Sequence, residues 1–324
     1  MLYLTYPIRL EVQVITESAS RLVDNIRKVF IGSEETIQLL LVGVLCEGHI
    51  LIEDVPGTGK TTLARALAAS LGCSFQRIQF TPDLLPSDVT GLSWFNQKQQ
   101  AFEFRPGPIM NQVILADEIN RATPRTQSAL LEAMQERQVT ADGVTRQLPR
   151  PFLVLATQNP VELEGTFPLP EAQIDRFLLR LRLGYPTQED ENTMVERFQA
   201  SDPMVDLHPV TSPAELTDMM VERSTIRVED SVRDYIVRVS RATRQNSDIQ
   251  LGASPRATLA LYQASQAWAA IHGREYVLPD DVKALAPSIF NHRLMIAPQA
   301  QLRGRSAQEL ISDIVTSVPV PVEA

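Results

Sequence analysis

A glycine-rich segment between a short apolar stretch and a helix-forming one constrains the fold of this chain most strongly. Residues 49–53 have the composition of a buried strand, residues 60–71 are rich in Ala and Leu, and Pro56-Gly57-Thr58-Gly59-Lys60-Thr61 leads from one to the other. In such a loop the backbone N–H groups and the helix N-terminus form a nest for an anion, and glycine lets a phosphate approach the backbone. We therefore predict a phosphate-binding loop (P-loop) in which Lys60 reaches the β- and γ-phosphates of a nucleotide and Thr61 ligates magnesium.

The first position of this loop departs from the usual pattern. The motif G-x-x-x-x-G-K-[ST] has glycine where this chain has Asp54. Aspartate tolerates unusual backbone angles better than most residues, so the turn remains possible. The alternative, a chance Gly-Lys-Thr at an ordinary helix start, is disfavoured because the segment follows a strand and opens a helix.

Two further apolar stretches end in polar side chains. Residues 113–116 are followed by Asp117 and Glu118, and residues 152–157 are followed by Gln158 and Asn159. Side chains at the carboxyl ends of parallel strands reach the crevice where ligands bind. Asp117 is then placed to hold the magnesium shell and Glu118 to orient and deprotonate water. Asn159 is a candidate donor to the γ-phosphate or the water, although asparagine at a strand end is more often a turn former.

Strands and helices alternate through the first part of the chain. Other stretches typical of strands are residues 74–80 and 178–183, the latter alternating Leu with Arg as a strand near an edge does. This alternation predicts an α/β core with a parallel sheet flanked by helices. Two inserted hairpins interrupt it, at residues 92–104 and at residues 138–148, where Asp142-Gly143 is a turn signal.

After Gly184-Tyr185-Pro186 only helical patterns follow, which places a domain boundary near residue 186. The predicted helices are residues 189–200, 214–223, 228–243, 255–272 and 279–290. We thus expect an N-terminal extension over residues 1–16, an α/β core over 17–185, a small all-helical lid over 186–300 and a frayed C-terminal tail over 301–324.

Composition argues against several classes of protein. A net charge of -9 and a pI near 5.1 do not suit a surface that neutralises nucleic-acid phosphates. Cys46 and Cys73 are the only cysteines, and the four histidines are scattered without metal-ligand spacing. The longest apolar run near the start, residues 39–46, is far shorter than the ~20 residues that span a bilayer, and the N-terminus lacks the pattern of a signal peptide. We expect a cytoplasmic protein.

Several ordered motifs carry a resemblance to a known family over about residues 17–295. They are Gly48-His49-Ile50-Leu51-Ile52-Glu53 before the P-loop, Asp117-Glu118-Ile119-Asn120-Arg121-Ala122, Ala156-Thr157-Gln158-Asn159-Pro160, Glu171-Ala172-Gln173-Ile174-Asp175-Arg176-Phe177 and Gly252-Ala253-Ser254-Pro255-Arg256-Ala257. With them the chain resembles the AAA+ ATPases, and within these the MoxR family. The resemblance implies a P-loop core and a helical lid, assembled as a homo-oligomeric ring, usually a hexamer.

The same resemblance implies roles for individual residues. It makes Asn159 the first sensor, Arg176 the arginine finger and Arg256 the second sensor on the lid. From the residues alone Arg176 is equally well half of a surface ion pair with Asp175, and Arg121 and Arg125 remain candidates for the finger. The implied contacts to ATP are Ile31 and Gly32 at the adenine, and Pro56, Gly57, Thr58, Gly59, Lys60, Thr61 and Thr62 in the P-loop.

The resemblance also indicates which process ATP hydrolysis drives. MoxR-like chains resemble chaperones that remodel or assemble a partner, often a metalloenzyme or a protein with a von Willebrand factor A domain. A nucleic-acid motor and a magnesium-chelatase-type subunit belong to the same clade and are the alternatives. The acidic balance and the lack of a basic, aromatic-rich stretch weigh against the motor.

Overall fold

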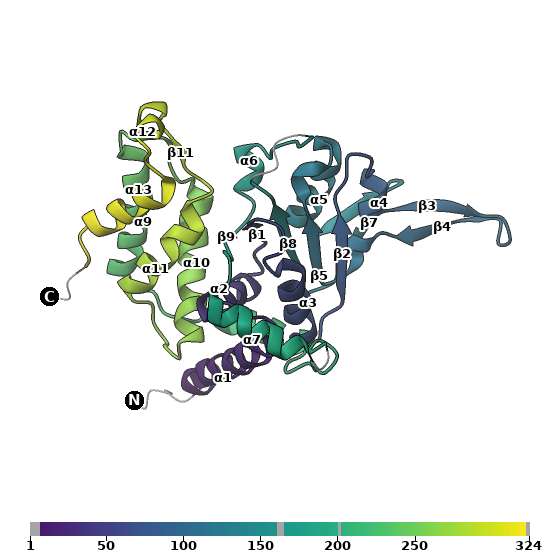
Figure 1. Cartoon of the computed structure of the whole chain (residues 1–324), viewed down its shortest axis with the longest axis horizontal. Helices are drawn as coiled ribbons and strands as arrows, with labels where there is room; N and C mark the ends of the chain where they lie inside the picture. Colours follow the sequence, from purple (N-terminus) through teal and green to yellow (C-terminus); the bar gives the residue numbers. More distant parts are fainter. Residues whose placement is uncertain (1–6, 161–164, 200–201, 322–324) are drawn as a thin grey trace, which may run out of the picture.

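A five-stranded parallel sheet organises the core of the molecule (Figure 1). This computed structural model describes residues 7–160, 165–199 and 202–321. The strands are β1 (Ile50–Glu53), β2 (Phe75–Gln79), β5 (Val113–Asp117), β8 (Leu153–Gln158) and β9 (Leu179–Leu181), in the order β2-β5-β8-β1-β9. The predicted parallel sheet is confirmed, and β9 is an edge strand as its alternating sequence indicates.

Helices cover both faces of the sheet. Ile50 and Ile52 face a cluster formed with α1 (Pro7–Arg27), α2 (Glu34–Leu45) and α3 (Lys60–Ser70). Leu51 faces the opposite cluster, formed with α5 (Pro124–Glu136). Because successive side chains of a strand point to opposite faces, a strand covered on both sides must be apolar throughout. This explains the unbroken Ile50-Leu51-Ile52 run directly before the P-loop.

The N-terminal segment differs from the prediction. Helix α1 begins at Pro7, inside the stretch expected to be an extension, and residues 1–6 lie outside the described residues. Proline is well tolerated in the first turn of a helix, and Val12 and Ile15 continue the buried stripe of the later turns. The Thr16 hydroxyl donates to the carbonyl of Ala270 at 3.0 Å, which ties α1 to α10 (Pro255–Ile271).

Both predicted hairpins are present. The first consists of β3 (Gly91–Asn96) and β4 (Ala101–Pro106), follows the short helix α4 (Pro86–Thr90), and projects from the body on the side away from the lid helices (Figure 1). The second consists of β6 (Gln138–Ala141) and β7 (Val144–Gln147). Its turn has positive φ at both Asp142 and Gly143, as a two-residue hairpin loop requires. The Arg146 guanidinium lies 3.8 Å from the centre of the Phe104 ring and connects the two hairpins.

The helical lid is confirmed, with one addition. Besides α10, the part of the chain after residue 186 contains α7 (Gln188–Phe198), α8 (Pro213–Arg223), α9 (Asp230–Gln245) and α11 (Pro279–Phe290). It also contains a small antiparallel ladder between β10 (Ile249–Leu251) and β11 (Met295–Ile296), which the expectation of an all-helical lid lacks. These strands are two and three residues long, too short for a periodic signal.

The C-terminal stretch is not a frayed tail over most of its described length. After α12 (Pro298–Leu302), helix α13 (Ala307–Ser317) packs on α9 and α11, with Leu310, Ile311 and Ile314 buried. Ser306 accepts from the Glu309 N–H and the Glu309 carboxylate accepts from the Ser306 N–H, which is a capping box. That pattern was visible in the sequence. Residues 322–324 lie outside the described residues.

One hydrophobic cluster extends from the sheet through α1 and α2 to the lid helices. The boundary near residue 186 therefore separates two parts that share a core, and it stays a prediction. Within the described ranges, no helix combines the length and the apolar character needed to cross a membrane.

Candidate active site

The P-loop follows the carboxyl end of β1 and leads into α3. Gly57 and Gly59 have φ values of 87° and 85°, in the left-handed region that favours glycine. No atom lies within 4 Å of the place where a Cβ of Gly57 would be, so the loop leaves open space beside its backbone. Lys60 Nζ folds back onto the loop, at 2.7 Å from the carbonyl oxygen of Val55 and 3.0 Å from that of Asp54.

Asp54, the departure from the P-loop pattern, has a structural role. Its Oδ1 accepts from the Val55 N–H at 2.8 Å, and its Oδ2 accepts from the N–H groups of Leu183 and Gly184, both at 2.7 Å. The carboxylate thus fastens the start of the P-loop to the segment that follows β9. Glycine has no side chain to accept these hydrogen bonds. With Asp54 in place of glycine, the backbone is less free at this position, but it is cross-linked to Leu183 and Gly184.

Asp117 ends the buried strand β5, and protein donors engage both of its oxygens. The Thr157 hydroxyl, from the neighbouring strand β8, donates to Oδ1 at 2.6 Å. Arg77, from β2, donates to Oδ2 through Nε at 3.0 Å and Nη2 at 2.6 Å. The sequence analysis missed both partners, because their 40-residue separation from Asp117 leaves no local signal.

Glu118 turns away from the strand with φ 57° and ψ 50°, a conformation that is uncommon for a residue with a side chain. Its N–H donates to Thr157 Oγ1 at 2.8 Å, which stabilises the turn. Glu118 Oε2 accepts from Gln79 Nε2 at 2.8 Å and from Arg121 Nη1 at 3.2 Å. Arg121, a candidate for the arginine finger, is thus engaged with Glu118 of its own chain.

A hollow of about 400 Å³ brings the predicted phosphate-site residues together. Its lining includes Lys60, Thr61, Asp117, Glu118 and Asn159, at the carboxyl ends of β1, β5 and β8. The Thr61 hydroxyl and the Asp117 carboxylate are the hard oxygen donors that magnesium prefers. Among the described residues no group of three or more His, Cys, Asp or Glu is placed to hold a metal. Magnesium bound at Thr61 and Asp117 would take its further oxygen ligands from nucleotide phosphates.

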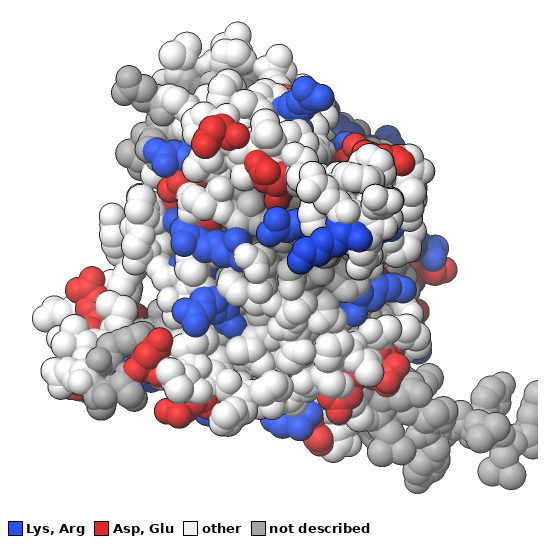
Figure 2. Space-filling view, turned by 90° about the vertical axis from the view of Figure 1, so that its right-hand side faces the viewer, with Lys and Arg blue, Asp and Glu red and all other residues white. Residues whose placement is uncertain are grey.

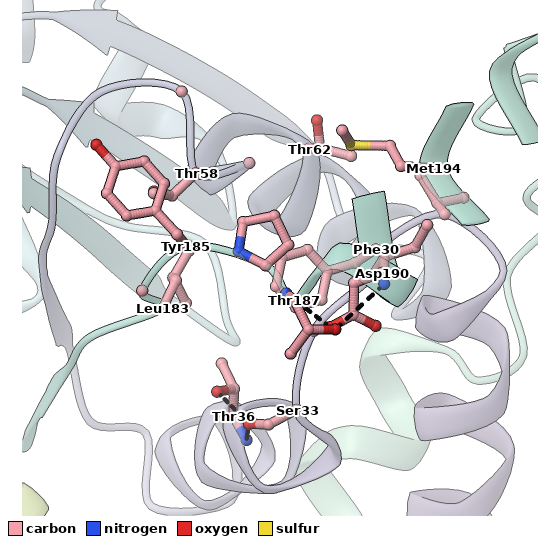
Figure 3. Close-up of a pocket in the computed structure, with 17 residues that line it drawn as sticks. Phe30, Ser33, Thr36, Thr58, Thr62, Leu183, Tyr185, Thr187, Asp190 and Met194 are labelled. Atoms are coloured by element: carbon pink, nitrogen blue, oxygen red, sulfur yellow. Dashed lines mark hydrogen bonds between the residues drawn. The ribbon is translucent and has the colours of Figure 1, made fainter. Parts of the chain in front are cut away.

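A second hollow, of about 280 Å³, adjoins the first and shares Gly57, Gly59 and Thr62 with it (Figure 3). It contains Ile31 and Gly32, the residues predicted to contact adenine. Its other walls include residues 183–187 and two residues of α7, none of which was predicted to belong to the site. Around it Figure 3 shows Phe30, Tyr185, Thr187, Asp190 and Met194. A mostly apolar hollow beside a P-loop suits a purine base.

Arg176 and Arg256 lie together in a third hollow of about 300 Å³, and none of its lining residues lines the other two. Gly48 and His49, which precede β1, line it as well. The P-loop follows the opposite end of β1, and four residues of strand span roughly 13 Å. The structure therefore separates both arginines from the P-loop of their own chain.

Asp175 has a different partner from the one considered from the sequence. Its Oδ1 accepts from Arg293 Nε at 2.7 Å, and its Oδ2 accepts from the Ser254 hydroxyl at 3.1 Å. Arg293 is buried and also donates to the carbonyls of Phe177 and Leu178. Since Ser254 caps α10, Asp175 connects the segment bearing Arg176 to the helix bearing Arg256.

His49 is a buried residue that connects neighbouring elements. Burial lowers its pKa to about 4, so the ring is neutral at physiological pH. Its Nδ1 accepts from the Val154 N–H at 3.0 Å, which leaves Nε2–H to donate to the Met134 carbonyl at 3.0 Å.

Comparison with known proteins gives two family matches and several close relatives. Residues 49–179 match the model of the ATPase family associated with various cellular activities (AAA), and residues 241–314 match the AAA lid domain. An uncharacterized protein of Bacillus subtilis, YeaC, is 51% identical over 93% of this chain and 94% of its own length. Chaperone MoxR1 of Mycobacterium tuberculosis is 39% identical over 93% of this chain and 82% of its own. A crystal structure from Cytophaga hutchinsonii, described as a candidate ATPase, is 38% identical and superposes with a TM-score of 0.90 over 97% of this chain and 98% of that one.

Proposed function

Since this chain belongs to the MoxR family of AAA+ ATPases, we propose that it binds ATP with magnesium in the two adjoining hollows and hydrolyses it to ADP and phosphate. One observation carries the proposal. Lys60, Thr61, Asp117, Glu118 and Asn159 come from three strand ends and line a single hollow. Because the second hollow shares the P-loop glycines, a nucleotide can place its base there and its phosphates beside Lys60.

Each residue then has a defined task. Lys60 leaves the Asp54 and Val55 carbonyls and pairs with the β- and γ-phosphates, for which the open backbone at Gly57 leaves room. Magnesium, when bound at Thr61 and Asp117, neutralises charge on the phosphate oxygens. Glu118 accepts a proton from the attacking water, and Asn159 donates to the γ-phosphate or orients the water.

We assign Arg176 and Arg256 to the ATP of a neighbouring subunit in a ring, with six subunits as the expected number. Both lie near the start of β1, whereas their own P-loop follows the end of that strand, so neither is near its own nucleotide. Two half-buried or exposed arginines in one hollow suit an anion brought by another molecule. A ring in which this hollow faces the next P-loop would supply that anion.

We assign the output of hydrolysis to chaperone-like remodelling of a partner protein, with a von Willebrand factor A domain protein or a metalloenzyme as the expected client. A relative named as a chaperone, 39% identical over most of the chain, supports a protein client. Figure 2 shows basic side chains gathered across the middle of one face, with acidic side chains above and below them, so this face is mixed in charge rather than basic throughout.

Calorimetric titration with a slowly hydrolysed ATP analogue and magnesium tests the proposal, with Lys60→Ala as the comparison. We expect saturable binding by the wild-type protein and none by a folded Lys60→Ala variant, because this lysine faces ligand rather than core. Phosphate release from ATP should follow the same pattern. Equal affinity of the two proteins would refute the P-loop assignment.

A further inference from the structure

Arg77 occupies the phosphate hollow although no part of the P-loop motif predicts an arginine there. It belongs to the edge strand β2 and reaches across to the end of β5. Its Nε and Nη2 both donate to Asp117 Oδ2, at 3.0 and 2.6 Å, while the Thr157 hydroxyl engages Oδ1 at 2.6 Å. The carboxylate expected to face the metal is therefore already neutralised by a cation of its own chain.

A guanidinium and a divalent cation compete for such a carboxylate. The lone pairs that accept from Arg77 are not available to a metal or to its bound water, and two cations close together repel each other. Arg77 has to move or to share Oδ2 when a metal arrives.

The difference in burial decides which partner moves. The Arg77 side chain is 47% exposed and opens onto the hollow, whereas that of Asp117 is 11% exposed and held by Thr157. A long, half-exposed side chain changes rotamer more readily than a short one fixed at the end of a buried strand. The negative phosphates of a nucleotide in the same hollow also offer the guanidinium another partner.

We infer that Arg77 competes with magnesium for Asp117 and thereby lowers the metal affinity of the site, an inference that rests on the proposed function. As long as neither metal nor nucleotide is bound, Arg77 stays hydrogen-bonded to the Asp117 carboxylate. When metal and nucleotide bind together, the guanidinium leaves Oδ2. Arg77 is thus a positioning residue that makes metal binding depend on phosphates being present.

Binding of Mn²⁺, used as a paramagnetic probe, tests this inference without any activity measurement. The free ion is quantified by electron paramagnetic resonance in two arms, nucleotide-free protein and protein in excess over ADP. Arg77→Gln should bind Mn²⁺ on the order of tenfold more tightly than wild type in the nucleotide-free arm, because a positive charge a few ångströms from the metal is gone. The gain should be smaller in the ADP arm, where the wild-type guanidinium has already left Oδ2. Arg77→Lys keeps the charge but not the planar fork, and should stay within about threefold of wild type. Equal or weaker Mn²⁺ binding by folded Arg77→Gln in the nucleotide-free arm overturns the inference.

The two possible failures are distinguishable. Absence of ADP binding by folded wild-type protein refutes the proposed function, while the nucleotide-free arm still reports the competition between Arg77 and the metal. A crystal structure of the wild-type protein with ADP and Mg²⁺ provides a second measurement that depends on no variant. In it the distance from Arg77 Nη2 to Asp117 Oδ2 should exceed about 3.5 Å, the limit of a hydrogen bond. Retention of both Arg77 contacts with the metal seated at Asp117 would also overturn the inference.

Discussion

Gln79 Nε2 lies 2.8 Å from Glu118 Oε2, so the last residue of β2 holds the carboxylate that follows β5. The same Gln79 accepts from Arg77 Nη2 through Oε1 at 2.5 Å, and Arg77 in turn engages Asp117. One chain of hydrogen bonds therefore connects the candidate metal ligand to the candidate base. Charge-assisted hydrogen bonds of this kind fix side-chain orientation.

Replacing Gln79 with glutamate tests this arrangement. A second carboxylate beside Glu118 replaces a hydrogen-bond donor with a like charge, and two like charges at this distance repel each other. Glu118 should therefore lose its position, and kcat should fall by more than about tenfold. Gln79→Ala is the matched control, because it removes the hydrogen bond without adding charge. It should lower kcat by less than about tenfold.

The opposite results are informative. If kcat rises in Gln79→Ala, Gln79 holds Glu118 away from the water rather than in place. If Gln79→Glu retains the wild-type kcat, the contact with Gln79 does not hold Glu118 in place.

Glu118→Gln should separate binding from chemistry. The amide keeps the size of the side chain and leaves the phosphate hollow intact but cannot accept the proton, so ATP should bind and persist. We expect ATP affinity within about threefold of wild type and phosphate release lowered by 10²-fold or more, roughly the contribution of a general base. Single-turnover measurement of phosphate release checks this, and hydrolysis at the wild-type rate would show that Glu118 is assigned wrongly.

Asp54→Gly restores the usual P-loop pattern and should nonetheless lower the stability of the folded protein. The N–H groups of Leu183 and Gly184 lose their acceptor, and we expect the free energy of unfolding to fall by about 1–3 kcal/mol. ATP affinity should fall as well, because Leu183 and Gly184 line the second hollow. Urea denaturation and nucleotide titration measure the two effects.

The matched control for this substitution is Asp54→Asn, which keeps an oxygen acceptor and should lose less stability. An Asp54→Gly variant as stable as wild type would show that the cross-link contributes nothing.

The sequence allowed prediction where a pattern is local or periodic. The P-loop, Glu118 and Asn159 each follow a strand of four to six residues, and Asp117 ends one. Parallel topology then brings them to one edge of the sheet. Arg77 and Gln79 escaped notice because their partners lie 39 or 40 residues away, in a contact that only the β2–β5 pairing creates.

The lid and the termini also separate into features with a local sequence pattern, which were predicted, and features without one, which were not. Helices with a clear apolar period were predicted within a few residues, whereas β10 and β11 are too short to show alternation. Residues 1–16 were expected to form an extension, although Val12 and Ile15 are buried on helix α1, which packs on α10. Asp175 is hydrogen-bonded to Arg293 and Ser254, which lie 118 and 79 residues away in the sequence. No local sequence pattern indicates these contacts.

Arg176 provides the test of the ring. If it acts on the ATP of the neighbouring subunit, Arg176→Ala rings should bind ATP almost normally and hydrolyse it about 10³-fold more slowly, the usual scale for an arginine finger. Each such subunit keeps Lys60, Asp117 and Glu118. Mixing it with Lys60→Ala subunits, which still carry Arg176, should restore activity wherever an intact P-loop meets an intact arginine.

Arg256→Ala should behave in the same way, since Arg256 lines the same hollow as Arg176. Arg238→Ala removes a half-exposed arginine paired with Asp234 on α9 and serves as the control, with activity near that of wild type. Activity of the mixture no higher than the sum of its components, with subunit exchange confirmed by a fluorescent label, would count against action across the subunit interface.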